Sequence, residues 1–189
     1  PLANGDGGYY LPFSSGPAPI YQRPGGKNAF LNLINQARNY VFITTPYLVI
    51  DYDLTQALCN AASRGVDVRI ITPGIPDKKI VKLMTKSSYP YLIRHGVRVF
   101  EYVPGFIHEK TVISDDIYGV VGTINFDYRS LAHHFENALW MFGTETIVDI
   151  KEAFLRTASL SDEKDGEDAK LSPGERVLRN FVRIFAPLL

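Results

Sequence analysis

The stretch FIHEKTVISDD, from Phe106 to Asp116, marks the point at which the pattern of the chain changes. Before it, segments with helical spacing of apolar residues alternate with short β-branched runs, which predicts parallel strands covered by helices. After it, the apolar run IYGVVGTINF follows with no helical segment in between, and the pair Asp115–Asp116 suits a hairpin turn. The sequence therefore predicts an α/β fold, with a mixed β-sheet flanked by helices on both faces.

The composition is that of an ordinary globular chain. Its 189 residues allow one domain with a sizeable core, and its 20 basic and 20 acidic side chains balance. Without a basic excess, a nucleic-acid partner is disfavoured. The single cysteine, Cys59, excludes an internal disulfide. No run approaches the ~20 apolar residues of a membrane span. The chain begins at Pro1 without a methionine, and we expect it to be a piece of a longer protein.

Four segments are expected along the chain. Residues 1–26 are rich in Gly and Pro and form a lead-in with one short strand, and residues 27–160 hold the regular helix and strand patterns. Residues 161–172 form a charged loop, and residues 173–189 form a C-terminal amphipathic helix.

That last helix carries a basic stripe. Arg176, Arg179 and Arg183 fall on one face at spacings of three and four, and apolar residues fill the rest. This pattern suits an anionic membrane surface. The alternative is a helix packed on the sheet with its arginines in water.

Two side chains of the opening stretch have chemical potential. Residues of a strand alternate between its faces, so His108 and Lys110 are expected to point the same way, with Glu109 opposite. A histidine with a pKa near ~6.5 is a usable nucleophile or base at neutral pH, and a lysine suits a phosphate oxygen. Asp115 falls at an odd offset from His108 and is expected to anchor the turn. Taken alone, His-x-Lys also fits a structural strand with an exposed pair.

The segments that follow add polar groups. Gly122, Thr123 and Asn125 come at the end of the next strand, where the hydroxyl and the amide can donate hydrogen bonds to a phosphate. Glu136 stands just before another apolar strand. A carboxylate at that place is expected to hold the far nitrogen of His108 and fix its tautomer.

The set of motifs resembles a known family. His108-x-Lys110-x4-Asp115, followed by Gly122-Thr123-x-Asn125, is similar to the HKD signature of the phospholipase D superfamily. The longer stretches GVRVFEYVPGFIHEKTVISDD and GTINFDYRSLAHHFENALW resemble the C-terminal half of bacterial cardiolipin synthases, and the likeness runs from about residue 29 to the end. Residues 27–160 are thus expected to be a phospholipase D-like catalytic half-domain.

The resemblance implies a role for each motif residue. His108 either attacks the phosphodiester phosphorus, forming a phosphohistidine, or acts as the general acid and base for that attack. Lys110, Thr123 and Asn125 bind the phosphate. Glu136 orients His108, and Asp115 completes the signature as a supporting residue. Threonine 123 stands where the family more often has serine. The resemblance implies no metal and no cofactor.

The superfamily uses two such motifs in one active site, whereas this chain has four histidines and one His-x-Lys. The second motif is expected from the N-terminal half of the same enzyme or from a homodimer partner. The implied activity is transfer of a phosphatidyl group from one phosphatidylglycerol to another, releasing glycerol, at the bacterial cell membrane. One alternative is a hydrolase of the same chemistry, either a phospholipase D or a homodimeric single-motif nuclease. Another is a non-catalytic domain that keeps the fold and only binds phosphates or a partner.

Overall fold

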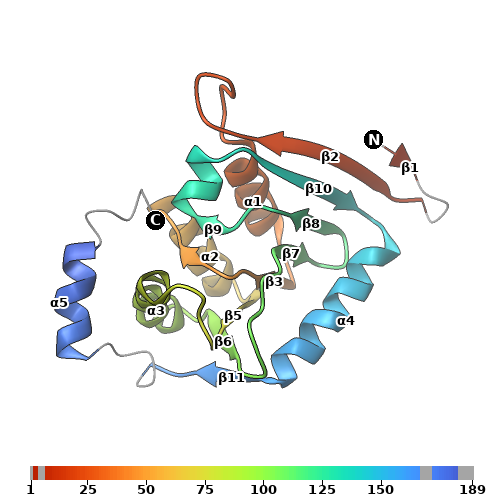
Figure 1. The fold of residues 1–189 in the computed structure, drawn as a ribbon. Helices are drawn as coiled ribbons and strands as arrows, with labels where there is room; N and C mark the ends of the chain where they lie inside the picture. The colour runs from red at the N-terminus through yellow and green to blue at the C-terminus, as the bar shows by residue number, and fades with distance from the viewer. Residues whose placement is uncertain (1, 4–6, 167–171, 183–189) are drawn as a thin grey trace.

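The structure is a computed structural model that describes residues 2–3, 7–166 and 172–182. A nine-stranded sheet runs through this part of the chain in the order β1-β2-β10-β8-β7-β3-β5-β6-β11 (Figure 1). Its strands are β1 (Leu2–Ala3), β2 (Tyr9–Ser15), β3 (Tyr40–Thr44), β5 (Asp67–Pro73), β6 (Arg98–Tyr102), β7 (Thr111–Ser114), β8 (Tyr118–Gly122), β10 (Glu136–Phe142) and β11 (Ser161–Lys164). A second, two-stranded sheet pairs β4 (Leu48–Val49) with β9 (Phe126–Asp127) in parallel.

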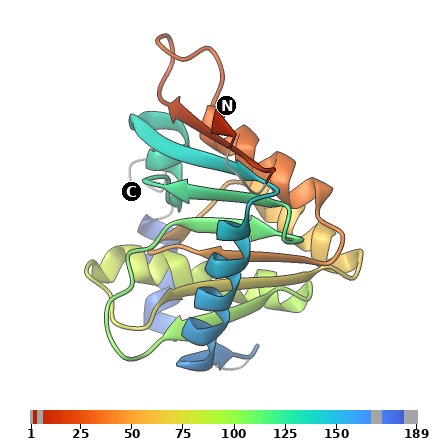
Figure 2. The same cartoon turned by 90° about the vertical axis from the view of Figure 1, so that its right-hand side faces the viewer.

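Helices cover both faces of the large sheet. The helices of the described chain are α1 (Gly25–Gln36), α2 (Tyr52–Ser63), α3 (Lys79–Arg94), α4 (Glu145–Ser159), α5 (Pro173–Val182) and the π-helical turn η1 (Arg129–His133). Helices α1, α2 and α3 bury Phe30, Leu58 and Tyr89 in one core, whereas α4 packs on the opposite face (Figure 2). There, Phe154 of α4 stacks on Phe42 of β3, with ring centroids 4.6 Å apart. The predicted α/β fold with helices on both faces is therefore confirmed.

The sheet is mixed because its two halves are connected differently. Strands β3, β5 and β6 run parallel, with helices as crossovers, as the alternating part of the sequence predicts. Strands β7 and β8 form an antiparallel hairpin. Asp115 and Asp116 connect the two strands with φ angles of 56° and 58°, a left-handed conformation that Asp tolerates better than most residues.

The strand prediction for FIHEKTVISDD is wrong in its first half. Strand β7 begins at Thr111, so His108 and Lys110 lie in the irregular segment before it. Thr111 pairs with Thr44, the last residue of β3, and with Val121 of β8. Because β3 ends at this point and Pro46 soon follows, no neighbouring strand continues the ladder beside His108.

Two further segments are more regular than predicted. Strand β2 of the lead-in pairs along the full length of β10, from Ser15 opposite Glu136 to Tyr9 opposite Phe142. The prediction of a loop over residues 161–172 is wrong for Ser161–Lys164, which form β11 against β6. Its charged side chains find partners there: Glu163 pairs with Arg98 at 2.7 Å.

The C-terminal helix is described only in part. Helix α5 lies beside α3 and leaves Val177 and Leu178 exposed (Figure 1). Residues 183–189, and the side chains of Arg176 and Arg179, lie outside what the structure describes. The predicted basic stripe is therefore not assessed.

Candidate active site

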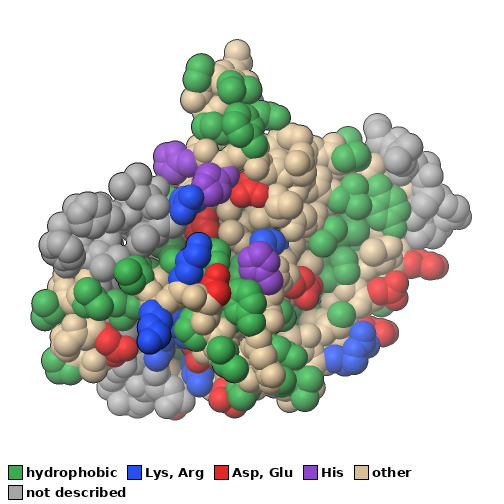
Figure 3. Space-filling model, in the orientation of Figure 1, with side chains coloured by type: hydrophobic (Ala, Val, Ile, Leu, Met, Phe, Trp, Pro, Cys, Tyr) green, Lys and Arg blue, Asp and Glu red, His purple; other side chains and the backbone are tan. Residues whose placement is uncertain are grey.

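Strand direction brings the predicted motifs to one edge of the sheet. Parallel strands β3 and β5 end there, and antiparallel β7 begins there. Strand β8 then ends, and β10 begins, at the same edge. The ends of parallel strands are a frequent place for ligand sites. Figure 3 shows histidine and basic side chains, with acidic ones between them, gathered on the corresponding face.

His108 is exposed and sits between two aromatic rings. Its ring centroid lies 5.5 Å from that of Phe106 and 6.5 Å, edge-on, from that of Tyr47. Partial burial lowers the pKa of His108 below its ordinary value, and the charges of Lys110 and Lys78 lower it further. The neutral imidazole, the form that acts as a nucleophile, is therefore favoured near pH 7.

Lys110 lies beside His108 and among carboxylates. Its ammonium donates a 2.7 Å hydrogen bond to the backbone carbonyl of His108. Burial lowers the pKa of Lys110, while Glu136, Asp127 and Asp77, in that order, oppose the shift. Lys110 thus lies next to His108 and close enough to the carboxylates of Glu136, Asp127 and Asp77 to be influenced by their charge.

Asn125 belongs to a small buried network. Its amide nitrogen donates to the Ser130 hydroxyl at 3.1 Å, and the backbone N–H of Ser130 donates to Asp127 at 2.7 Å. Asp127 is only 4% exposed, and burial raises its pKa. Within the described part of the chain, the buried Asn125 Oδ1 has no hydrogen-bond partner. The Asn125 side chain also hydrogen-bonds to Asp127, and this bond opposes the rise in the pKa of that carboxyl.

Glu136 contacts Thr123 and not the predicted histidine. The Thr123 hydroxyl donates a short hydrogen bond to Glu136 Oε2, and the backbone N–H of Asn137 donates to the same hydroxyl at 3.0 Å. The carboxylate is 8% exposed, and its nearest ring nitrogen is His134 Nδ1 at 3.9 Å. Among the described residues, no hydrogen bond joins Glu136 to His108, because the β8–β10 ladder directs Glu136 toward Thr123.

Asp115 lies at the other end of β7, away from these residues. Its carboxylate accepts hydrogen bonds from the backbone N–H groups of Arg38, Asn39 and Tyr40, at 2.7, 2.9 and 2.9 Å. These donors lead into β3. Asp115 thus connects the hairpin turn to the start of the neighbouring strand.

Several residues near His108 were not selected from the sequence. The Tyr47 hydroxyl donates to Asp77 at 2.5 Å, and the ammonium of Lys78 lies 5.6 Å from the centre of the Tyr47 ring. Asp77 and Lys78 follow the carboxyl end of β5. Ligand sites often lie at the carboxyl ends of parallel strands, so this position in the sequence could have indicated them. Asp127 is a third such residue, and it is the last residue of the short strand β9.

The described residues contain no group of three or more His, Cys, Asp or Glu side chains placed to hold a metal ion. They also contain no helix that is both long enough and apolar enough to cross a bilayer.

Comparison with known proteins identifies the chain's class and then its family. The fold matches that of a phospholipase D family member, Nuc from Salmonella typhimurium, with a TM-score of 0.70 at 18% identity, over 83% of this chain and 98% of that one. It also matches phosphatidylserine synthase from Haemophilus influenzae, with a TM-score of 0.74 at 17% identity, over 97% of this chain and 47% of that one. These matches show that the chain has the phospholipase D-like fold.

The sequence is more specific. Residues 30–158 match the family described as "Cardiolipin synthase, PLD-like domain", and the chain belongs to that family. It is 45% identical to an uncharacterized protein of Streptococcus mutans over 96% of this chain. It is 34% identical to a cardiolipin synthase of Halalkalibacterium halodurans over 97% of this chain. The chain spans 39% and 36% of the lengths of these two relatives.

Proposed function

We propose that this chain is one half of a phosphatidyltransferase that makes cardiolipin from two phosphatidylglycerol molecules and releases glycerol. The observation that carries the proposal is the pair His108 and Lys110. An exposed imidazole with a lowered pKa stands beside an ammonium group, at the edge where Thr123 and Asn125 also lie. The family supports the choice of reaction, because relatives in it are named cardiolipin synthases.

In the first step, a ring nitrogen of His108 attacks the phosphorus of the donor phosphatidylglycerol. A P–N bond forms, the P–O bond to the head-group glycerol breaks, and the leaving oxygen takes a proton from a second acid. Lys110, together with Asn125 at the same edge of the sheet, stabilises the charge on the phosphoryl oxygens. The neutral state of His108 keeps its lone pair available for this attack.

In the second step, the hydroxyl of another phosphatidylglycerol attacks the phosphohistidine. It gives its proton to the same second group, and the P–N bond breaks to release cardiolipin. We propose that the second group is the histidine of another His-x-Lys motif, carried by the N-terminal half of a longer polypeptide or by a second copy of this chain. The partial span of this chain relative to its relatives favours the first source.

The substrates place the reaction at a membrane surface. Phosphatidylglycerol is anionic and resides in the bacterial cell membrane, so the site has to face that surface. The exposed Phe106 beside His108 is suited to contact lipid. The reaction as proposed requires no metal and no cofactor.

The test is an assay with ³²P-labelled phosphatidylglycerol in mixed micelles. The full-length protein that carries this chain is expected to form cardiolipin and glycerol. Quenching in base, which preserves phosphohistidine, should trap label on the protein. His108→Ala should abolish both product and label while keeping the melting temperature. Phosphatidic acid as the sole product would instead indicate a hydrolase.

A second arm tests the missing motif. The 189-residue chain alone is expected to show little or no turnover, and activity should return when the longer protein is assayed. His95→Ala is the matched control for His108→Ala. It also removes a histidine, but from the C-terminal end of α3, away from the site. Robust turnover by a monomer of the chain alone would contradict the two-motif proposal.

A further inference from the structure

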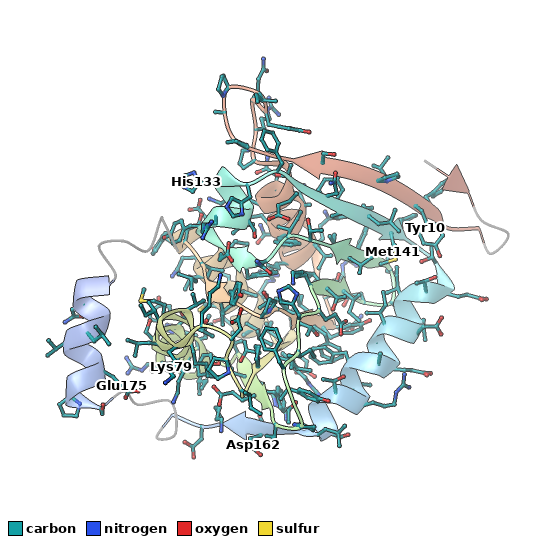
Figure 4. The ribbon with its side chains drawn as sticks, viewed as in Figure 1. Tyr10, Lys79, His133, Met141, Asp162 and Glu175 are labelled. Atoms are coloured by element: carbon teal, nitrogen blue, oxygen red, sulfur yellow. The ribbon has the colours of Figure 1, made fainter. Side chains whose placement is uncertain are left out.

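Arg129 is a basic residue at the rim of the site that the phosphate chemistry above does not use. It begins η1, directly after the Asn125–Asp127 segment, and its side chain is exposed. Figure 4 labels His133 at the other end of η1, at the outer rim of the molecule. Arg129 is thus an exposed residue of the turn that follows the Asn125–Asp127 segment of the site.

The guanidinium of Arg129 is held from one side. Its Nε–H donates to His134 Nε2 at 3.1 Å, so that ring nitrogen accepts and is unprotonated. The other ring nitrogen, Nδ1, faces Glu136 Oε1 at 3.9 Å. A row of contacts thus runs from Arg129 through His134 and Glu136 to Thr123 at the end of β8.

The two terminal nitrogens of the same guanidinium face outward. In the described portion of the chain, the hydrogen bond from Nε to His134 is the one recorded for the Arg129 side chain, and no carboxylate pairs with it. These nitrogens form a planar pair of donors that matches two oxygens of a phosphate. An arginine fixed through Nε and open at its terminal nitrogens is pre-organised for an anion.

We propose that Arg129 binds the phosphodiester of the acceptor phospholipid, the phosphate that is not attacked. This inference rests on the proposed function. A transferase that joins two phosphatidylglycerols has to hold two phosphates, and Lys110 and Asn125 account for only one. A hydrolase, whose acceptor is water, needs no second anion site. Arg129 therefore determines the acceptor, whereas His108 and Lys110 act on the donor.

The assay measures how the phosphatidyl group is shared among acceptors. Full-length protein is incubated with phosphatidylglycerol and labelled free glycerol. Cardiolipin, labelled phosphatidylglycerol and phosphatidic acid are then each quantified in the same reaction. Arg129→Gln is expected to lower the ratio of cardiolipin to labelled phosphatidylglycerol about tenfold, the effect of losing one charge-assisted contact. Transfer to free glycerol, which has no phosphate, should stay near the original rate.

Two variants serve as controls. Arg129→Lys keeps the charge but not the planar pair of donors, so it should recover part of the ratio. Arg156→Gln removes an arginine whose side chain is 70% exposed on α4, and it should change nothing. An equal loss of transfer to both acceptors would overturn the inference and assign Arg129 to the donor site or to the fold. An unchanged ratio would overturn it as well.

A binding experiment separates this inference from the proposed function. The Nε–H signal of Arg129, identified by its loss in Arg129→Gln, is followed by NMR while dihexanoyl phosphatidylglycerol or inorganic phosphate is added to His108→Ala protein. A saturable shift with the lipid, and a weaker one with inorganic phosphate, supports the inference even if the protein makes no cardiolipin. No shift, or an equal shift with both, overturns it.

Discussion

The hydroxyl of Tyr47 donates a 2.5 Å hydrogen bond to Asp77, and the ring of the same tyrosine lies edge-on to His108. Tyr47 follows β3 and Asp77 follows β5, so two neighbouring parallel strands deliver this contact. Asp77 and the adjacent Lys78 also act on His108 through their charges. The charge of Asp77 raises the pKa of His108, and the charge of Lys78 lowers it.

These two charges predict opposite changes in the pH profile. In the proposed mechanism His108 attacks as the neutral imidazole, so kcat/KM should rise with pH through the pKa of His108, which burial lowers from its ordinary value, and then level off. Lys78→Gln removes a cation that lowers this pKa and should move the acid limb to higher pH. Asp77→Asn should move it to lower pH. Both side chains are exposed, so each shift is small and shrinks in high salt. Shifts of equal sign in the two variants would contradict the assignment.

Asp115→Asn should act on stability and leave the chemistry intact. The carboxylate accepts three backbone N–H groups, and an amide oxygen can replace only part of that. Asn still tolerates the left-handed backbone, so the expected loss is about 1–3 kcal/mol in the free energy of unfolding. Thermal melting and activity at a temperature where the variant is folded measure the two effects. Asp162→Asn, a carboxylate 68% exposed on β11, is the control. Lost activity with an unchanged melting temperature would mean that Asp115 takes part in catalysis.

Gly122→Ala should disturb the end of β8. A Cβ at this position would lie 2.3 Å from the Asn137 carbonyl oxygen and 2.6 Å from Ala138 Cα, both backbone atoms of β10. The strands must separate, so we expect a loss of about 1–3 kcal/mol in stability and a displaced Thr123. Gly166→Ala, where a Cβ meets nothing within 4 Å, should be neutral. Equal melting temperatures for the two variants would contradict this close approach.

Thr123 should depend on its hydroxyl and not on its methyl group. The hydroxyl donates to Glu136 and accepts from the Asn137 backbone N–H. Thr123→Ser keeps both contacts and should retain activity within about twofold. Thr123→Val leaves the nearly buried Glu136 carboxylate without its donor and should lower kcat on the order of tenfold. If valine were tolerated as well as serine, the Thr123–Glu136 contact would have no role in the reaction.

The sequence was most informative where structure is local or follows a recurring motif. Helical spacing of apolar residues predicted helices in the first part of the chain, and in α1 the buried side is formed by Phe30, Leu33 and Ile34. The change from alternating helices and strands to a hairpin predicted the mixed sheet. The motif residues His108, Lys110, Thr123 and Asn125 were also visible, because their types and spacing match a family signature.

The tertiary structure decided the features that depend on distant partners. A strand extends only as far as a neighbouring strand supplies hydrogen bonds. Strand β7 therefore begins at Thr111, which pairs with Thr44, the last residue of β3. Local alternation of residue types cannot reveal this. For the same reason, β2 and β11 became strands only through pairing with β10 and β6.

The same division holds for the site. The sequence by itself determined the kind of fold and the residues able to act on a phosphate. The tertiary structure decided which of them meet: Glu136 holds Thr123 and not His108, Asp77 and Lys78 set the charge around His108, and Arg129 stands open at the rim. The physical reason is that residue type and period specify local geometry, whereas contacts between side chains are fixed only when strands far apart in the chain align.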